Sequence, residues 1–307
     1  MLTASALVHL AHTLIKYGVG LASSVAVLSL AALYIFQRKL VYPSYLNEAR
    51  VTVDTPDKFD IPYESIDINT SDGEILQSYL MLHDRDDVNY TNKTVLILSP
   101  NAGNIGMFLP VVNYIYRTLN YNVFIYSYRG YGKSTGSPSE RGLKLDADAV
   151  MKFISSHKQL SQSSIITYGR SIGGAVAIYI ASVYGHQISA LILENTFLNI
   201  HKVIPHIFPF LKPVSWMCTE FWNSEEAIKR IRPDLPCLFL AGTQDEIVPP
   251  EHMKMLYDLV SSDSDEERKA CTVWREFKAH HNDTIVAPGY WETWAQFAKE
   301  MVIPVGN

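Results

Sequence analysis

The stretch that most constrains the fold runs from Ile165 to Ala177 and reads IITYGRSIGGAVA. Its first half is apolar and β-branched, which predicts a buried strand, and its second half is rich in small residues, which predicts the start of a helix. Gly169 and Gly173 flank Ser171, two residues away on either side. In such a strand-to-helix turn the central serine is held in a strained conformation that only small neighbours tolerate. The pattern therefore predicts a serine presented at the carboxyl edge of a sheet.

The surroundings expected for this serine suit a negatively charged intermediate. A helix N-terminus carries free N–H groups and partial positive charge, so the N–H of Ile172 is the first predicted oxyanion donor. The second donor in this arrangement comes from a turn after an early strand. Leu96–Leu98 runs into the turn Ser99–Asn104, and we expect Asn101 to be this donor. An ordinary strand–helix turn with Asn104 as its N-cap is the alternative interpretation.

A serine becomes a nucleophile only when a base takes its proton and a carboxylate orients that base. Where the serine lies on such a turn, the acid follows it in the chain and the histidine comes last. Asp245 comes just after the apolar strand Leu238–Gly242 and is the predicted acid, with the adjacent Glu246 as the alternative. His280 and His281 follow a later strand. The residue pattern leaves both open as the base.

Composition narrows the function classes further. The chain has 307 residues, of which 48% are hydrophobic and 19% charged, so it is globular rather than disordered. Its net charge of −5 argues against nucleic acid as a partner. Its three cysteines are widely spaced and form neither a disulfide framework nor a zinc pattern. We expect the chemistry to need no metal ion and no organic cofactor.

Short apolar segments alternate with helical patterns along most of the chain. Predicted helices include Phe108–Leu119 and Leu143–Ser156. This alternation predicts an α/β fold with a mostly parallel sheet and helices on both faces. In chain order the predicted strands are Ser65–Asn69, Glu74–Leu82, Thr94–Leu98, Asn122–Tyr128, the strand beginning at Ile165, Ala190–Glu194, Pro236–Gly242 and Thr272–Phe277.

An uncharged apolar stretch, Tyr17–Gln37, lies near the start of the chain. About twenty apolar residues span a bilayer as a helix, so residues 1–40 are expected to carry a transmembrane helix over about 17–37, followed by a catalytic domain over 41–307. A cleaved signal peptide is the alternative, but the stretch is long for one and lacks a basic start. The expectation is a single-pass membrane protein.

Two signals bear on the side of the membrane that holds the domain. Arg38 and Lys39 follow the apolar stretch and favour a cytosolic domain. Asparagine glycosylation sequons would be usable only in a lumen. Four of them begin at Asn69, Asn89, Asn92 and Asn282.

Residues 196–233 form a cap-like insertion between two predicted core strands. This segment is crowded with aromatic and branched apolar residues and is interrupted by prolines at 205, 209 and 213. It has two interpretations: a helical excursion that packs on the core, or a lid that binds an acyl chain.

Six short motifs occur together and in order, and they resemble those of one family. The motifs are Pro100–Gly106, Tyr128–Gly132, Gly169–Gly174, Glu194–Phe197, Asp245–Pro250 and His281–Thr284. They resemble the membrane-anchored α/β-hydrolases of the fungal bud-emergence family and its animal relative, the α/β-hydrolase domain-containing type-13 protein. The similarity runs from about residue 30 to the C-terminus.

The resemblance implies an α/β-hydrolase fold with Ser171 as nucleophile, Asp245 as acid and His281 as base, because His281 heads the last motif. It places the oxyanion donor at Asn101. The family usually has His-Gly before this asparagine, where the chain has Ser99 and Pro100. Proline has no N–H, so Pro100 is no donor and Asn101 remains the expected one.

The function expected from the sequence is that of a membrane-anchored serine hydrolase. It would cleave acyl esters or thioesters through an acyl-enzyme, with a small molecule, a lipid or an acylated protein as substrate. The expected location is the endoplasmic reticulum or another endomembrane. The alternatives are a serine peptidase and a catalytically silent scaffold on the same fold.

Overall fold

The computed structural model describes residues 4–261 and 266–303 and divides into two compact units, each described by itself below. The first unit is a single helix, α1 (Ala4–Val41). Its part His12–Val41 is apolar and long enough to cross a membrane. The helix is longer than the uncharged stretch because the flanking residues are mostly alanine, leucine and other good helix formers.

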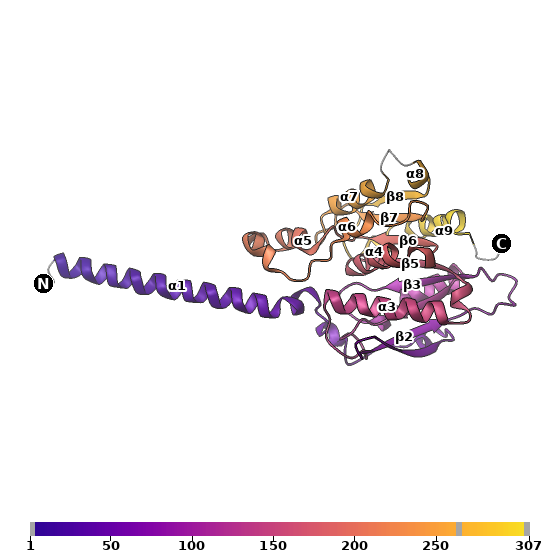
Figure 1. The fold of residues 1–307 in the computed structure, drawn as a ribbon, viewed down its shortest axis with the longest axis horizontal. Helices are drawn as coiled ribbons and strands as arrows, with labels where there is room; N and C mark the ends of the chain where they lie inside the picture. Colours follow the sequence, from indigo (N-terminus) through magenta and orange to yellow (C-terminus); the bar gives the residue numbers. More distant parts are fainter. Residues whose placement is uncertain (1–3, 262–265, 304–307) are drawn as a thin grey trace. The chain divides into compact units, whose positions relative to one another are not determined.

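The second unit begins at Tyr42 and is built on one eight-stranded sheet (Figure 1). All eight predicted strands are present, which confirms the α/β prediction. They are β1 (Glu64–Asn69), β2 (Ile75–Met81), β3 (Lys93–Leu98), β4 (Asn122–Tyr126), β5 (Ser164–Arg170), β6 (Ala190–Glu194), β7 (Cys237–Gly242) and β8 (Thr272–Phe277).

The strand order across the sheet is β1-β2-β4-β3-β5-β6-β7-β8. The hairpin β1–β2 and the pair β2–β4 are antiparallel, and every other neighbouring pair is parallel. The sheet is therefore mostly parallel, as predicted. Parallel neighbours place their carboxyl ends at one edge, so the segments that follow β3, β5, β6, β7 and β8 meet there.

Helices cover both faces of this sheet. Phe239 of β7 packs edge-on against Tyr257 of the helix α7, whereas its neighbours Leu238 and Leu240 belong to the cluster that contains residues of α9. The helices that flank the sheet are α2 (Leu109–Asn113), α3 (Glu140–Ser156), α4 (Ile172–Tyr184), α7 (Pro250–Val260) and α9 (Tyr290–Met301); a short helix, α8 (Glu266–Ala270), precedes β8.

The predicted helix over Phe108–Leu119 is present, but its hydrogen-bonding pattern changes along its length. A 3-10 turn (Ile105–Phe108) precedes α2, and a π turn (Tyr114–Thr118) follows it. The widened π turn places Tyr114 in a stack on Trp291 of α9, with ring centroids 4.2 Å apart. Tertiary aromatic packing thus overrides the simple helical pattern.

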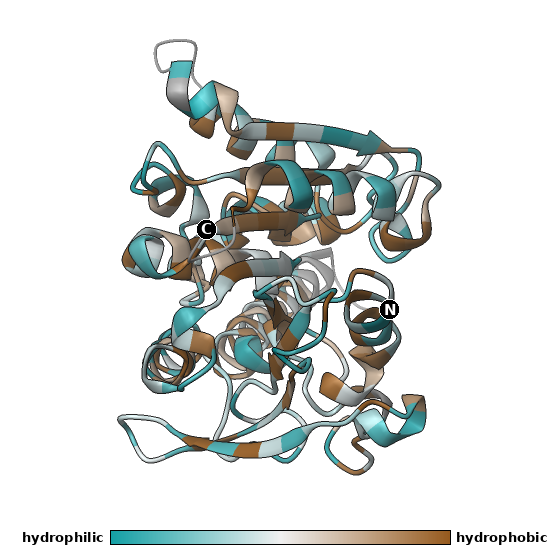
Figure 2. Cartoon of the chain, turned by 90° about the vertical axis from the view of Figure 1, so that its right-hand side faces the viewer, coloured by the Kyte–Doolittle hydropathy of each residue, from teal (hydrophilic) through white to brown (hydrophobic). Residues whose placement is uncertain are grey.

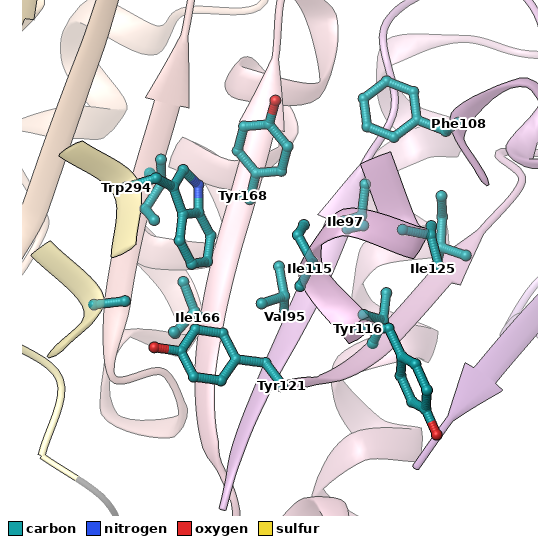
Figure 3. Packing of buried hydrophobic residues seen from close by; sticks show 14 of the residues in the cluster. Val95, Ile97, Phe108, Ile115, Tyr116, Tyr121, Ile125, Ile166, Tyr168 and Trp294 are labelled. Atoms are coloured by element: carbon teal, nitrogen blue, oxygen red, sulfur yellow. The ribbon is translucent and has the colours of Figure 1, made fainter. Parts of the chain in front are cut away.

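The core on one face of the sheet is formed by alternate strand residues. Val95 and Ile97 of β3 and Ile166 of β5 lie with Trp294 of α9 in this cluster (Figure 3). The middle strands are buried along their whole length, whereas β8 at the edge is buried only at its two ends and is partly or fully exposed between them. In Figure 2 the strand at the top edge of the sheet has an apolar segment in its first part and is hydrophilic toward its arrowhead.

The cap-like insertion contains α5 (Ile200–Ile207), a 3-10 helix η7 (Pro209–Met217) and α6 (Ser224–Ile228). Its side chains divide into two groups. Phe197, Ile200, Val203 and Trp222 are buried, whereas Phe208, Phe210 and Trp216 are exposed. Neither sequence interpretation describes both groups, because the inner residues pack on the domain and the outer aromatic residues face solvent.

Candidate active site

Ser171 lies on the turn between β5 and α4. Its backbone has φ 56° and ψ −122°, a strained conformation for a residue with a side chain. The strain is held by hydrogen bonds on both sides, because the Ser171 N–H donates to Glu194 O at 2.9 Å and Thr196 Oγ1 donates to Ser171 O at 2.7 Å. The turn is therefore fixed by the last residue of β6 and by the segment that follows this strand.

Two glycines make this turn sterically possible. A Cβ on Gly169 would lie 2.2 Å from Gly173 O, and a Cβ on Gly173 would lie 2.0 Å from Leu98 O. Real Cβ atoms do not approach backbone so closely. The second contact also shows that the start of α4 lies directly against the end of β3, where the loop of Asn101 begins.

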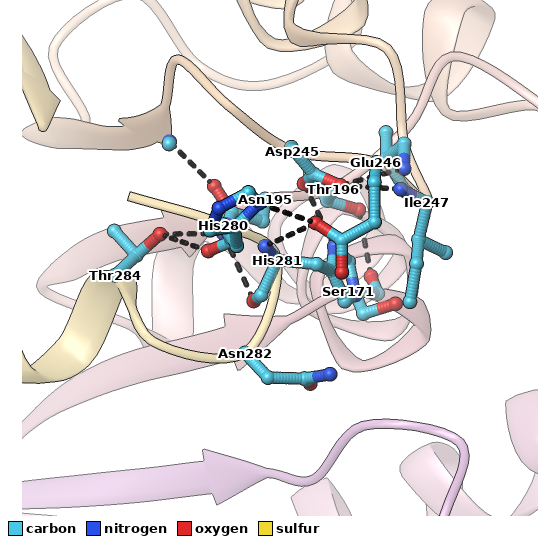
Figure 4. A network of polar contacts seen from close by, with 12 residues as sticks. Ser171, Asn195, Thr196, Asp245, Glu246, Ile247, His280, His281, Asn282 and Thr284 are labelled. Atoms are coloured by element: carbon cyan, nitrogen blue, oxygen red, sulfur yellow. Dashed lines mark hydrogen bonds and ion pairs between the residues drawn. The ribbon is translucent and has the colours of Figure 1, made fainter. Parts of the chain in front are cut away.

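Asp245 and His281 meet at the same edge of the sheet (Figure 4). His281 Nδ1 lies 2.7 Å from Asp245 Oδ2, and both side chains are buried. The other carboxylate oxygen, Asp245 Oδ1, accepts the backbone N–H groups of Ile247 and Val248 at 2.9 and 2.8 Å. The carboxylate is therefore fixed in place, and it can in turn fix the ring of His281.

His280 has a different environment from its neighbour. Its side chain is 58% exposed, and its Nδ1 lies 3.2 Å from Glu246 Oε2. Partial burial opposes the ionisation of Glu246, but hydrogen bonds from backbone N–H groups, including that of His281, and from the His280 ring lower its pKa overall. The structure therefore brings His281 and Asp245 together and places His280 and Glu246 as a second, outer pair.

The described residues include no hydrogen bond between the Ser171 hydroxyl and His281. Ser171 is 7% exposed and His281 is 4% exposed, and the two lie in the same polar network in Figure 4. Hydrogen bonds between a nucleophile and its base are often long in ligand-free enzymes and shorten when substrate binds. We expect the hydrogen bond between these two side chains to form when substrate binds.

The loop after β3 is held by two buried tyrosines. Tyr128 OH donates to Ser99 O at 3.0 Å, and Tyr131 OH donates to Asn101 O at 2.9 Å. These bonds hold the loop carbonyls on the tyrosine side. Asn104 is also the N-cap of the following 3-10 turn, because its Oδ1 accepts from Gly106 N at 2.9 Å.

The Asn195 side chain links the loop that carries Asp245 to the loop that carries His281. It follows β6 with φ 45° and is 1% exposed. Its Nδ2 donates to His281 O at 3.1 Å and to Thr284 Oγ1 at 2.8 Å, while its Oδ1 accepts Gly242 N at 2.8 Å. One side chain thus holds the end of β7, which leads to Asp245, and the loop that carries His281.

The buried carboxylate of Glu194, the residue before Asn195, is surrounded by two tyrosines and an arginine. Glu194 Oε2 accepts the hydroxyl groups of Tyr168 and Tyr290 at 2.5 and 2.7 Å, and Arg170 Nε lies 4.0 Å from Glu194 Oε1. Burial, reinforced by the Glu194 carboxylate, raises the pKa of both tyrosines, so they remain hydrogen-bond donors. Arg170 Nη2 also donates to Asn282 Oδ1 at 2.6 Å, next to His281.

These supporting residues received no role from the sequence pattern. Asn195 and Thr284 lie in two of the six motifs, but the reason for their presence is a set of tertiary hydrogen bonds. The available signal was position: Asn195 directly follows a strand that lies between the strands leading to Ser171 and Asp245.

Comparison with known proteins places this geometry in a family. A family model of the α/β-hydrolase fold matches residues 93–213. An uncharacterized membrane protein of Saccharomyces cerevisiae is 47% identical over 273 residues, 89% of this chain and 92% of that protein. Protein bem46 of Schizosaccharomyces pombe is 44% identical over 290 residues, 93% of each chain. The chain belongs to the bud-emergence family of α/β-hydrolase domain proteins.

Solved structures agree on the fold of this bud-emergence family member. The esterase Pf2001 of Pyrococcus furiosus superposes with a TM-score of 0.67, covering 83% of this chain and 97% of that chain at 22% identity. This likeness shows the fold. Family membership and the α/β-hydrolase fold together support a hydrolase.

Proposed function

We propose that this protein is a membrane-anchored serine hydrolase that cleaves acyl ester or thioester bonds through an acyl-enzyme, with Ser171 as nucleophile, His281 as base and Asp245 as acid. The observation that carries the proposal is the buried 2.7 Å pair of His281 Nδ1 and Asp245 Oδ2, at the sheet edge where Ser171 is held in a strained turn. This combination favours nucleophilic catalysis over a purely structural role for three buried polar side chains.

In the acylation step, Ser171 Oγ attacks the carbonyl carbon of the substrate and its proton passes to His281 Nε2. Asp245 stabilises the resulting imidazolium through Nδ1–H. The negative charge on the former carbonyl oxygen is stabilised by the N–H groups of Ile172 and Asn101. The C–O or C–S bond then breaks, and the departing alcohol or thiol takes the proton from His281 Nε2.

Deacylation repeats these steps with water. The water molecule attacks the acyl carbon and gives one proton to His281 Nε2. The bond between Ser171 Oγ and the acyl group then breaks, the serine recovers the proton, and a carboxylic acid leaves. The same groups act twice, and no cofactor enters the balance.

Labelling with a fluorophosphonate probe tests the nucleophile. The full chain should be labelled, and Ser171→Ala should lose the label completely, because the probe reacts with an activated serine hydroxyl. Ser155→Ala, which changes an exposed serine on α3, is the matched control and should keep the label. Persistent labelling of Ser171→Ala would refute the assignment. An unlabelled full chain would favour the silent scaffold.

A series of substrates with increasing acyl length tests the substrate class. Each buried methylene contributes about 0.8 kcal/mol, or about fourfold in kcat/KM, so efficiency should rise with chain length until the acyl site is filled. The apolar inner residues of the cap and the N-terminal apolar helix support this class. A flat profile together with cleavage of peptides would instead indicate a serine peptidase.

We further propose that α1 is a retained single-pass anchor in the endoplasmic reticulum or another endomembrane. The relative from Saccharomyces cerevisiae carries the name of a membrane protein, which supports the proposal. Deletion of residues 1–39 should release the domain from membranes and leave catalysis intact. Carbonate extraction of the full chain into the soluble fraction would contradict a spanning helix, and a glycosidase-sensitive mobility would place the domain in a lumen.

A further inference from the structure

The outer part of the cap, residues 207–217, exposes more aromatic surface than a soluble domain usually does. Phe210 and Trp216 are 76% and 72% exposed, and Ile207 and Phe208 are 41% and 42% exposed. The 3-10 helix η7 contains no buried residue. The Phe208 and Phe210 rings contact only each other edge-on among the described aromatic pairs, with centroids 6.1 Å apart. Such a patch marks an interaction surface.

The charged residues in and around the outer cap indicate which kind of partner it could contact. Residues 195–219 contain Lys202 and Lys212 and no aspartate or glutamate, although the whole chain has a net charge of −5. Lys202 is paired with Glu225, whereas Lys212 lies exposed between Phe210 and Trp216 in the sequence. Exposed tryptophan and phenylalanine beside lysine are typical of segments that lie in the headgroup region of an anionic bilayer.

The base of the cap is held to the domain by hydrogen bonds, whereas the outer cap is exposed. Glu140 Oε2, at the start of α3, accepts the N–H groups of Phe221 and Trp222 at 2.7 and 2.8 Å. Glu220 Oε2 accepts Tyr42 OH at 2.8 Å, and Trp222 Nε1 donates to the same hydroxyl at 2.7 Å. The cap therefore starts from a fixed base, and its aromatic residues extend from it into solvent.

Tyr42, which bonds to the base of the cap, also adjoins the apolar helix in the sequence. It is the first residue of the domain and directly follows the apolar helix that is long enough to cross a membrane. The next exposed apolar residues along the chain are Tyr45, Leu46 and Val51, in the connector after Tyr42. Exposed apolar residues of the domain therefore occur both in the connector that follows the helix and in the cap, whose base is bonded to Tyr42.

We propose that the outer cap, residues 207–217, is a second membrane-contacting element that inserts Phe208, Phe210 and Trp216 into the interface of an anionic lipid bilayer. Insertion removes exposed aromatic surface from water, and anionic headgroups attract Lys212. This proposal concerns lipid contact alone and does not depend on the hydrolase chemistry, since it is tested without substrate.

The experiment uses the full chain in vesicles of phosphatidylcholine and phosphatidylglycerol, with lipids brominated near the headgroup end of the acyl chain. The helix α1 contains no tryptophan, and Trp216 is the strongly exposed one of the five tryptophans. Trp216 fluorescence should therefore be quenched by the brominated lipids. Trp216→Phe keeps an aromatic side chain and removes the reporter, so this variant should lose the quenching.

Two variants that keep Trp216 test whether the aromatic face is needed for lipid insertion. Phe210→Asp should reduce the quenching of Trp216, because it places a carboxylate in the inserting face. Val88→Asp changes a residue that is 96% exposed in a distant loop and should leave the quenching unchanged. Far-UV circular dichroism of both variants checks that they fold.

Three results would overturn the proposal. Equal quenching of the unmodified chain and Trp216→Phe would show that another tryptophan reports. Equal quenching of Phe210→Asp and Val88→Asp would show that the aromatic face is not involved. A blue-shifted Trp216 emission that brominated lipids do not quench would show that protein, such as a second copy of this chain, covers the patch.

Discussion

The outer cap lies in the chain between members of the strand-end cluster, but the two regions are built in opposite ways. In the strand-end cluster (Ser171, Asn195, Asp245, His281 and Thr284), all five side chains are buried, and those of the last four are hydrogen-bonded to one another or to backbone. In the outer cap (residues 207–217), no residue of the 3-10 helix is buried, and the aromatic rings face solvent.

The difference lies in what holds each region. Buried polar groups cost free energy unless they are bonded, so the strand-end cluster has one arrangement that satisfies its members. The exposed rings of the outer cap bury little surface against the domain, and exposed apolar patches of this kind are typical of interaction surfaces. The first region is thus organised for fixed geometry, and the second is the exposed surface for which we propose lipid contact.

The largest effect should come from the base in the strand-end cluster. His281→Ala should lower turnover by ~10⁴ or more, because the serine then lacks a proton acceptor. His280→Ala is the matched control, since His280 is exposed and bonded to Glu246 rather than Asp245. Turnover of both variants with a p-nitrophenyl ester measures the difference. The opposite ranking would assign the base to His280, and the buried strand-end cluster would then not be the catalytic region.

The inner and outer parts of the cap should differ in their effect on stability. Trp222→Ala should lower the free energy of unfolding by about 3–5 kcal/mol, because Trp222 is 2% exposed and bonded to Tyr42. Trp216→Ala should change it by less than about 0.5 kcal/mol. Urea unfolding of the domain measures both. Similar losses would mean that the outer cap is packed in solution, which would weaken the comparison.

A smaller effect on turnover is expected at Asn195. Asn195→Ala should lower kcat by about 10²-fold with little change in KM, because the loops of Asp245 and His281 lose their shared support. Asn195→Asp keeps the acceptor for Gly242 N and should shift the acid limb of the kcat profile to higher pH, since a nearby carboxylate favours the imidazolium. If both variants lose the same free energy of unfolding and leave the dependence of kcat on pH unchanged, Asn195 has a purely structural role.

The smallest effect is a pH dependence of stability where the cap meets α7. Burial, together with Lys202 and His206, lowers the pKa of His252 from 6.5 to about 4, although Glu251 and Glu225 act in the opposite direction. A histidine with a lowered folded pKa contributes stability that is present above the unfolded pKa and is lost as the pH falls.

The expected loss between pH 7 and pH 5 is about 2 kcal/mol in the free energy of unfolding, because the unfolded state takes up the proton first. His252→Gln removes this contribution and should flatten the profile by that amount. The difference between the two unfolding curves, rather than either curve alone, is the measurement, since carboxylates titrate in the same range. Parallel curves would show that His252 is not buried in solution.

The sequence predicted the architecture well because its signals are local. Each core strand is a short apolar run, and the glycines beside Ser171 reflect a turn confined to a few residues. The same locality explains why the sequence predicted the helix over 108–119 but not its π turn, which accommodates the stacking of Tyr114 on Trp291 from the far end of the chain.

By itself, the sequence determined the fold class, the strand order along the chain and the short set of residues from which an active site could be drawn. The family resemblance pointed to His281, but the residue pattern itself left both histidines open, and the tertiary structure places His281 rather than His280 against Asp245, because neighbours after a strand end point in different directions that the loop path sets. The tertiary structure also decided the connecting role of Asn195 and the exposure of Phe210 and Trp216. These properties depend on contacts between segments far apart in the chain, and no local pattern of residues records them.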